Sequence, residues 1–287
     1  MVNTNTILFH YTSQEGLIGI TESASIWGTN VLYLNDASEF NYAKNLLSKE
    51  IKIFCETNPE FNIGKSWGYF FFESLMNNIN KLLSSGNYSC YVSSFSEESD
   101  LLSQWRGYCK DGSGYSLGFS RISLQNIVNR AGFVLKPCIY DEDEQVNGLR
   151  ELVRKASNRF VLEVGTKGEN WDTKSKYIAA DILLDFIQLY PFIKHPKFEE
   201  EREWRIVANL QTSKVNNMIK FRSSRTMIVP YIEIQLPIAK DSLIIDEVVV
   251  GPTRESDISM ASVELLLKAN SVIYSNIKYS TIPYRPL

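Results

Sequence analysis

The sequence predicts an α+β protein in which a curved, mixed β-sheet core carries helices on its outside. Segments with strand-like and helix-like patterns occur in blocks and do not alternate as βαβ units, which argues against a doubly wound parallel sheet. Aromatic residues make up 12% of the chain, with 15 Tyr and 15 Phe, and suit β-structure. Because no linker or shift of composition divides the chain, we expect one domain over residues 1–287.

The first third of the chain is expected to combine short strands with longer helices. Ser13 has the position of an N-cap and Asp36 and Glu39 have the spacing of a capping box, so a helix should follow each. The expected elements, in order, are a strand over Thr6–Thr12, a helix after Ser13, a strand over Trp27–Thr29 and Val31–Leu34, a helix from Asp36 to about Phe54, and a helix over Trp67–Leu83.

The rest of the chain is expected to be rich in strands around a pair of long helices. The predicted strands are Tyr88–Ser96, Tyr115–Ser120, Phe133–Tyr140, Glu203–Asn209, Thr226–Leu236 and Ile244–Val250, with tail segments at Val272–Tyr274 and Ile277–Ile282. The predicted helices are Leu101–Tyr108, Gln145–Val164, Thr173–Leu189 and Ser256–Lys268, with an acidic loop over Asp141–Glu144.

Composition and charge exclude several classes of protein. The net charge of −3 gives no general attraction to nucleic acid or to an anionic membrane. Four scattered cysteines do not form a disulfide scaffold, and no segment has the pattern of a signal peptide or a membrane span. We therefore expect a cytoplasmic protein that does not act at a membrane.

Nucleotide-binding glycine motifs and metal-ligand motifs are absent from the sequence. There is no GxGxxG, no Walker loop, no GxSxG and no HExxH, and the chain holds only two histidines, His10 and His195. We therefore expect no histidine or thiolate metal site, whereas a Mg²⁺ site made of carboxylates stays open. Acid and base chemistry here has to depend on carboxylates.

Two groups of polar residues lie on predicted strands and can bind a ligand or simply complete the core. His10 and Tyr11 lie on the first strand, where the imidazole can bond a ribose hydroxyl and the ring of Tyr11 offers a flat face. Ser94 and Ser96 point to one side of their strand and are followed by Trp105-Arg106, where Arg106 can hold a phosphate.

The third group lies in an acid-rich segment that leads into the predicted strand Glu203–Asn209. A period of two puts Glu201, Glu203 and Arg205 on one face of that strand. If this face is solvated surface, the charges satisfy each other; if it lines a cleft, the carboxylates can stabilise a cationic centre.

Taken together and in order, these motifs resemble an uncharacterised bacterial family known as domain of unknown function 2971. The resemblance rests on a list of motifs along nearly the whole chain: His10-Tyr11, Asn35-Asp36 with Glu39, Ser94-Phe95-Ser96, Trp105-Arg106, Gly114–Phe119, Phe198 with Glu201, Glu203 and Arg205, Val248–Pro252 and Ile282–Arg285. The order of motifs is also similar to that of ADP-ribosyltransferases, which consume NAD.

The second resemblance implies a role for each candidate residue and NAD as the substrate. His10 would contact a ribose hydroxyl, Ser94 and Ser96 would support the nicotinamide end, and Tyr11 or Tyr33 would stack on nicotinamide. Glu203 would bond the hydroxyl of the nicotinamide ribose, and Glu201 would steer the acceptor. This hypothesis expects His10, Ser96 and Glu203 around one cleft, and expects Glu203→Gln to fold normally while releasing almost no nicotinamide.

The function implied is an NAD-consuming ADP-ribosyltransferase, a toxin or anti-phage effector that modifies a protein or a nucleic acid and needs no metal. Three alternatives stay open: an NAD glycohydrolase, in which water replaces the acceptor; a catalytically inactive module that binds a nucleotide or a partner; and a nuclease with a carboxylate-bound metal. The nuclease requires Asp36, Glu39 and Glu201 or Glu203 to converge.

Overall fold

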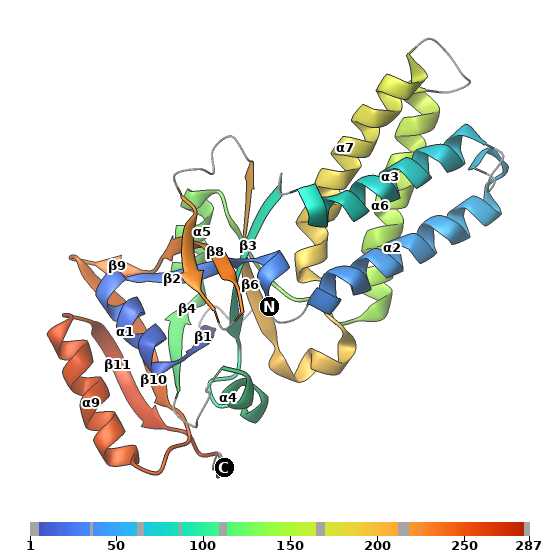
Figure 1. The fold of residues 1–287 in the computed structure, drawn as a ribbon. Coiled ribbons are helices and arrows are strands. Elements are labelled where there is room, and N and C mark those ends of the chain that lie inside the picture. Colours follow the sequence, from blue (N-terminus) through green and yellow to red (C-terminus); the bar gives the residue numbers. More distant parts are fainter. Residues whose placement is uncertain are drawn as a thin grey trace.

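A curved, largely antiparallel sheet forms the centre of the computed structural model, which describes residues 6–34, 37–61, 66–85, 88–108, 114–164, 170–211, 218–224 and 226–283. Within these residues, neighbouring strands follow the order β11-β10-β4-β1-β3-β2-β8-β7, and β6 pairs with β3 and β5. Figure 1 shows helices outside the sheet and a helical bundle extending from one end. The predicted α+β class with a curved, mixed sheet is confirmed.

The strands are β1 Ile7–Thr12, β2 Ser25–Asn30, β3 Tyr88–Ser96, β4 Tyr115–Ser120, β5 Val134–Pro137, β6 Glu203–Gln211, β7 Lys220–Ser223, β8 Ile228–Gln235, β9 Ile238–Ala239, β10 Ser242–Val250 and β11 Ile273–Tyr279. The helices are α1 Gln14–Ser23, α2 Ala37–Thr57, α3 Trp67–Ser85, α4 Leu102–Tyr108, α5 Arg121–Ala131, α6 Glu142–Glu163, α7 Trp171–Leu189 and α9 Ser256–Ala269. Short 3-10 turns are η1 Val31–Tyr33, η2 Pro59–Phe61, η4 Tyr190–Phe192 and η5 Pro196–Glu201.

Strand β3 is the junction of the sheet. It pairs with β6 along its whole length, from Tyr88↔Gln211 to Ser96↔Glu203. On its other edge, the described pairing to β1 is the single pair Phe9↔Ser96, and the pairing to β2 covers Thr29↔Val92 and Asn30↔Tyr91. Strands β1 and β2 therefore diverge from β3 and leave an opening beside residues 93–95.

Two large hydrophobic clusters stabilise the fold. One lies between the sheet and helices α1, α5 and α9, and includes Phe119, Ile206 and Val248. The other lies inside the bundle of α2, α3, α6 and α7, where Phe72 and Phe186 are almost completely buried. The acid-rich start of β6 lies where the sheet meets this bundle, as Figure 1 shows.

Several predicted elements differ from the structure for local reasons. Residues Val31–Tyr33 form a 3-10 turn and not a strand, because the Asn30 side chain accepts a hydrogen bond from the Leu32 amide at 3.0 Å. The expected acidic loop is the first turn of α6: Asp141 caps this helix by accepting from the Glu144 amide at 2.8 Å, and acids stabilise a helix N-terminus.

Other predictions differ only in extent. Strand β5 is shorter than expected, β11 joins the two tail segments into one strand, and α5 and β7 were not predicted. Two predicted features lie outside the described residues: the capping residue Asp36, and Tyr284-Arg285 of the last motif.

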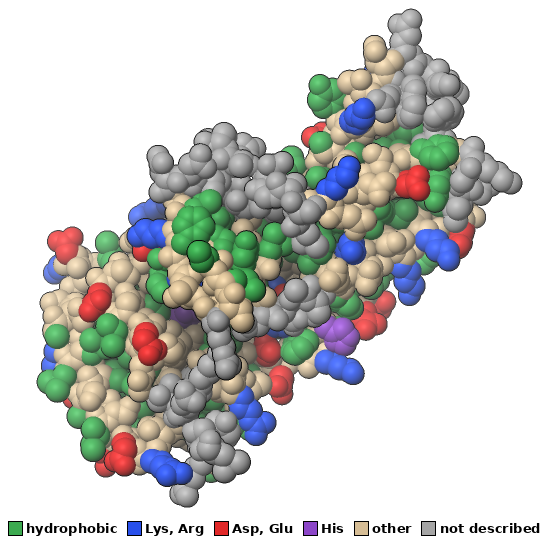
Figure 2. All heavy atoms as spheres, in the orientation of Figure 1, with side chains coloured by type: hydrophobic (Ala, Val, Ile, Leu, Met, Phe, Trp, Pro, Cys, Tyr) green, Lys and Arg blue, Asp and Glu red, His purple; other side chains and the backbone are tan. Residues whose placement is uncertain are grey.

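The visible surface in Figure 2 carries acidic and basic side chains that are interspersed rather than gathered by sign, in keeping with the small net charge. None of the helices among the described residues has the length and apolar character needed to cross a membrane.

Candidate functional site

The two glutamates of the acid-rich segment come together through a turn and not through the pleat of one strand. Strand β6 begins at Glu203, so Glu203 and Arg205 share a face, opposite Ser96 and Ser94 of β3. Glu201 ends the 3-10 turn η5, and Arg202 after it has a positive φ of 41°. The prediction that Glu201 lies on the strand is wrong, although the turn brings its carboxylate to the same place.

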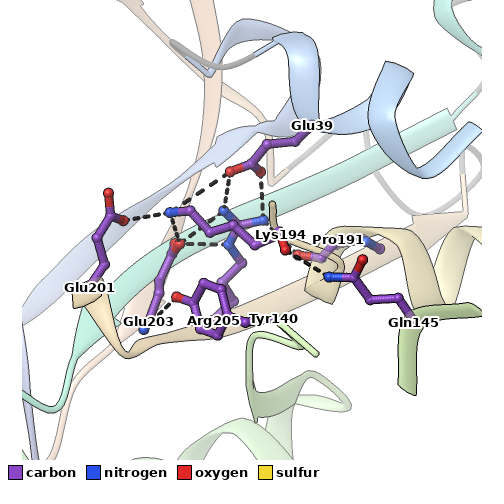
Figure 3. Close-up of polar contacts among 8 residues, drawn as sticks. All are labelled: Glu39, Tyr140, Gln145, Pro191, Lys194, Glu201, Glu203 and Arg205. Carbon is purple, nitrogen blue, oxygen red and sulfur yellow. Dashed lines mark hydrogen bonds and ion pairs between the residues drawn. The ribbon is translucent and has the colours of Figure 1, made fainter. Parts of the chain in front are cut away.

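A buried lysine, Lys194, joins these carboxylates. Its Nζ lies 2.5 Å from Glu201 Oε2 and 2.5 Å from Glu203 Oε2, and 3.9 Å from Glu39 Oε1 (Figure 3). Lys194 lies between η4 and η5, where no sequence period marks a residue as buried. Lys194 was therefore not predicted as part of the site.

Arg205 completes the cluster and extends it to the helical bundle. Its Nε and Nη2 donate to the two oxygens of Glu203 at 2.8 and 3.0 Å. Its Nη1 and Nη2 lie 2.8 and 2.9 Å from the carboxylate oxygens of Glu39 on α2, and Nη1 also donates to the Pro191 carbonyl at 2.6 Å. Such two-bond pairs fix both distance and orientation.

Neutral side chains hold this cluster in position. Gln145 of α6 donates to the backbone carbonyl of Lys194 at 2.7 Å and to that of Ile139 at 2.6 Å, and accepts from Tyr42 at 2.9 Å. The Tyr140 hydroxyl accepts the backbone amide of Glu203 at 3.0 Å. The positions of Lys194 and Glu203 are thus set by backbone contacts as well as by charge.

Glu203 is ionised although it is buried. Only 5% of this residue is exposed, so of the two alternatives for this face, solvated surface does not apply to Glu203. Burial alone would raise the pKa of Glu203, but the positive charges of Arg205 and Lys194 outweigh it and lower the pKa to about 2. Glu203 in turn raises the pKa of Lys194 against the opposing effect of burial.

The charges of the cluster do not cancel. Three carboxylates, from Glu39, Glu201 and Glu203, face two cations, from Lys194 and Arg205, which leaves one negative charge. In a site with little water, such a charge acts strongly on any positive charge that develops beside it.

A small cavity lies against this cluster. Its volume is about 10 Å³, the room of one water molecule. Aromatic rings and polar groups share its wall, which consists of Phe9, Tyr11, Ser94, Phe95, Gln104, Tyr108, Glu201 and Glu203. The cavity is therefore enclosed by β1, β3, β6 and α4, and we call it the α4 cavity.

Three polar side chains on this wall have no hydrogen-bond partner among the described residues: Ser94, Gln104 and Tyr108. Gln104 is only 9% exposed, so protein covers most of this residue. Burial of the hydroxyl end of Tyr108 and the nearby Glu203 carboxylate raise the pKa of Tyr108 to about 12, so this hydroxyl remains a donor at neutral pH.

His10 does not join the α4 cavity. By register, Phe9, Ser96 and Glu203 share one face of the sheet, so His10 points to the other, where its ring lies 5.6 Å from that of Phe95. His10 Nδ1 bonds the Ser94 carbonyl at 2.9 Å in the opening between β1 and β3. The prediction that His10, Ser96 and Glu203 lie on adjacent strands is confirmed. The prediction that all three side chains line one cleft is wrong, because His10 points to the other face.

The protonation state of His10 follows from its surroundings. Burial lowers the pKa of His10 below its usual value, more than the Ser94 carbonyl raises it. Because a carbonyl only accepts, the neutral ring carries its proton on Nδ1 and leaves Nε2 as an acceptor.

Two predicted ligand residues have structural partners instead. Ser96 donates to the Glu201 carbonyl at 2.7 Å and accepts the Glu98 amide at 3.0 Å, which fixes the turn before β6 against β3. Tyr11 donates to the Glu98 carbonyl at 2.7 Å and accepts the Leu101 amide at 3.1 Å, while its ring lines the cavity. The hydroxyls of Ser96 and Tyr11 therefore fix the positions of α4 and of the turn at Glu201, and they are not free to bind a ligand.

The last two predicted residues, Tyr33 and Arg106, are exposed and absent from the cavity wall. Tyr33 belongs to η1, and Arg106 lies on α4 between the two residues that do reach the cavity, Gln104 and Tyr108. The neighbouring Trp105 is completely buried and donates to Asp100 at 2.7 Å, so it belongs to the core.

Glu39 does converge with Glu201 and Glu203, as the nuclease hypothesis requires. Two basic side chains, Lys194 and Arg205, lie among these carboxylates and pair with them where a metal ion would otherwise have to lie. In the part of the chain that the structure describes, no group of three or more His, Cys, Asp or Glu is arranged to hold a metal ion. Asp36 lies outside the described residues.

The fold and this site define an α+β protein whose central sheet meets a helical bundle at a buried cluster of charges. The family described as "Protein of unknown function (DUF2971)" matches residues 104–206, just over a third of the chain. The match includes Gln104, Tyr108, Lys194, Glu201 and Glu203, whereas the motifs around His10 and Ser94 lie outside it. No curated protein and no solved structure matches the chain.

Proposed function

We propose that the chain cleaves the glycosidic bond of NAD at the α4 cavity, as an ADP-ribosyltransferase-like enzyme. The observation that carries this proposal is the charge cluster beside that cavity, in which Glu39, Glu201 and Glu203 carry one negative charge more than Lys194 and Arg205. Two of these acids, Glu201 and Glu203, line the cavity. Departure of nicotinamide leaves positive charge on the ribose, and a carboxylate held nearby stabilises that charge without a metal.

NAD does not fit into a cavity of about 10 Å³, so binding requires α4 to move away from the sheet. The helix has seven residues, and two contacts hold it: the Tyr11 hydroxyl accepts the Leu101 amide before its start, and the buried Trp105 in its middle donates to Asp100. Its end at Tyr108 is 47% exposed. In this proposal His10 has no contact with the reacting ribose, because it points to the other face of the sheet.

The acceptor of the ADP-ribosyl group is a protein or nucleic acid in our proposal, which suits a toxin or an anti-phage effector. The test is incubation of the purified chain with NAD labelled in its adenine part, with nicotinamide release and transfer of label measured separately. Release with transfer supports a transferase, and release without transfer identifies a glycohydrolase. Activity should survive EDTA, whereas loss on chelation and recovery with Mg²⁺ would favour the nuclease.

A second candidate function is a catalytically inactive module that binds a nucleotide or a partner. It is favoured by the contacts of Glu203, whose oxygens are all engaged by Arg205 and Lys194, and by the closed state of the cavity. Binding of NAD without release of nicotinamide would select this candidate.

A further inference from the structure

We propose that Glu201, and not Glu203, is the carboxylate that faces the reacting ribose, and that Gln104 and Tyr108 of α4 bind the hydroxyls of that ribose. Glu203 is then a positioning residue. This inference rests on the proposed function and specifies which side chains carry it out.

Both oxygens of Glu203 are engaged by buried cations. Arg205 Nε donates to Oε1 at 2.8 Å, Arg205 Nη2 donates to Oε2 at 3.0 Å, and Lys194 Nζ donates to Oε2 at 2.5 Å. Its exposure of 5% is the lowest of the three acids in the cluster. A carboxylate accepts about four hydrogen bonds, and Glu203 already accepts three from buried cations, so a substrate hydroxyl finds at most one acceptor site, on Oε1.

Glu201 has the opposite set of contacts. Lys194 holds its Oε2, while Oε1 has no hydrogen bond or ion pair to any described residue. Figure 3 shows this second oxygen pointing away from the lysine. Its side chain is 18% exposed and lines the α4 cavity, and Ser96 fixes its backbone. Glu201 therefore combines a fixed position with an oxygen that is free to accept.

Gln104 is the second observation that points to a ligand. It is nine-tenths buried, lies on the cavity wall, and its amide has no partner within the described residues. An amide that no protein group engages keeps two donors and an acceptor that a ligand in the cavity can use. Leucine of similar size would fill the same space without these groups.

The free groups around the cavity match a sugar more closely than a phosphate. Glu201 accepts hydrogen bonds, Gln104 both donates and accepts, and Tyr108 donates. Two adjacent hydroxyls of a ribose can donate to the carboxylate and accept from the amide, and the rings of Phe9 and Tyr11 offer apolar faces. The net negative charge of the cluster disfavours an anion at the same position.

The experiment compares Glu201→Gln, Glu203→Gln and Gln104→Leu in the full-length chain, with Glu200→Gln as a matched control at an exposed neighbour. For each variant, nicotinamide release gives kcat and KM for NAD, and the melting temperature reports stability. We expect Glu201→Gln to lose about 10²–10³-fold in kcat and to lower the melting temperature less than Glu203→Gln does, because Glu201 is the more exposed partner of Lys194. We expect Gln104→Leu to melt at or above the wild-type temperature and to raise KM, and Glu203→Gln to melt earlier.

Different results overturn different steps. A wild-type chain that releases no nicotinamide ends the proposed function and this assignment with it. An active wild-type chain whose Glu201→Gln variant keeps kcat, or whose Gln104→Leu variant keeps KM, overturns the assignment alone. A Glu203→Gln variant that folds like the wild type but loses kcat returns the reacting role to Glu203.

Discussion

Arg205 on β6 and Glu39 on α2 form a two-bond ion pair, at 2.8 and 2.9 Å, across 166 positions of sequence. Both residues also belong to the cluster that holds Glu203. The pair therefore connects the sheet to the helical bundle and orients the candidate site at the same time.

Breaking this pair should destabilise the protein strongly. Glu39→Gln leaves the Arg205 guanidinium, which is almost completely buried, with one carboxylate in place of two. We expect a loss of about 3–5 kcal/mol in the free energy of unfolding, measured by urea denaturation. Glu163→Gln is the control, because its ion pair with Arg159 is exposed and should contribute less than about 1 kcal/mol. Equal effects of the two variants would contradict the prediction.

Stability should fall in acid through Glu203. Its pKa is about 2 in the folded protein, below the ordinary value of 4.5, so the folded state binds this proton less readily than the unfolded chain does. The stability from this group is fully present above pH 4.5 and is lost as the pH falls from there towards 2. Urea denaturation between pH 7 and pH 3 should show this loss, and Glu203→Gln should make the profile flatter over the same range. If the free energy of unfolding of Glu203→Gln depended on pH as steeply as that of the wild type, a group other than Glu203 would cause the acid sensitivity.

Asp100 should control the attachment of α4. Its Oδ1 accepts from Trp105 at 2.7 Å and Ser280 at 2.6 Å, and its Oδ2 accepts the backbone amide of Thr281 at 2.7 Å. Burial would raise the pKa of Asp100, but these donors together lower it. Asp100→Ala should cost about 1–3 kcal/mol and speed amide hydrogen exchange in α4. Asp143→Ala, at an exposed position, should leave exchange in α4 unchanged.

Two glycines offer a matched pair of substitutions. A Cβ at Gly251 would lie 2.8 Å from the Gly114 carbonyl oxygen and 3.1 Å from the Trp105 ring, so Gly251→Ala should cost about 1–3 kcal/mol. A Cβ at Gly19, on α1, would meet nothing within 4 Å, so Gly19→Ala should gain about 0.5–1 kcal/mol from helix propensity. Melting temperatures that move in the same direction for both would contradict this account.

Local patterns predicted the elements well and the burial of charge poorly. Strands Tyr88–Ser96 and Tyr115–Ser120 were predicted with their observed bounds, since each is a strand-like run that ends at turn residues or a helix cap. The period of two also paired Glu203 with Arg205. What covers that face could not be predicted, because Glu39 comes from a helix far away in sequence.

The residues that line the α4 cavity also could not be predicted from the sequence. The helix at Leu101–Tyr108 was expected, but its pattern drew attention to Trp105 and Arg106, and not to Gln104 and Tyr108. A polar residue one position before a buried tryptophan gives no sign that it is itself buried. Lys194 lies in irregular backbone, where spacing carries no information about burial.

The single residue pair between β1 and β3 has a mechanical consequence. The half of the sheet made of β11, β10, β4 and β1 is tied to the half that contains β6, β3 and β2 through Phe9↔Ser96 and little other backbone bonding among the described strands. Under a pulling force, or early in unfolding, β1 and β3 should therefore separate at Phe9↔Ser96 first. Each half of the sheet should lose its own backbone hydrogen bonds only later.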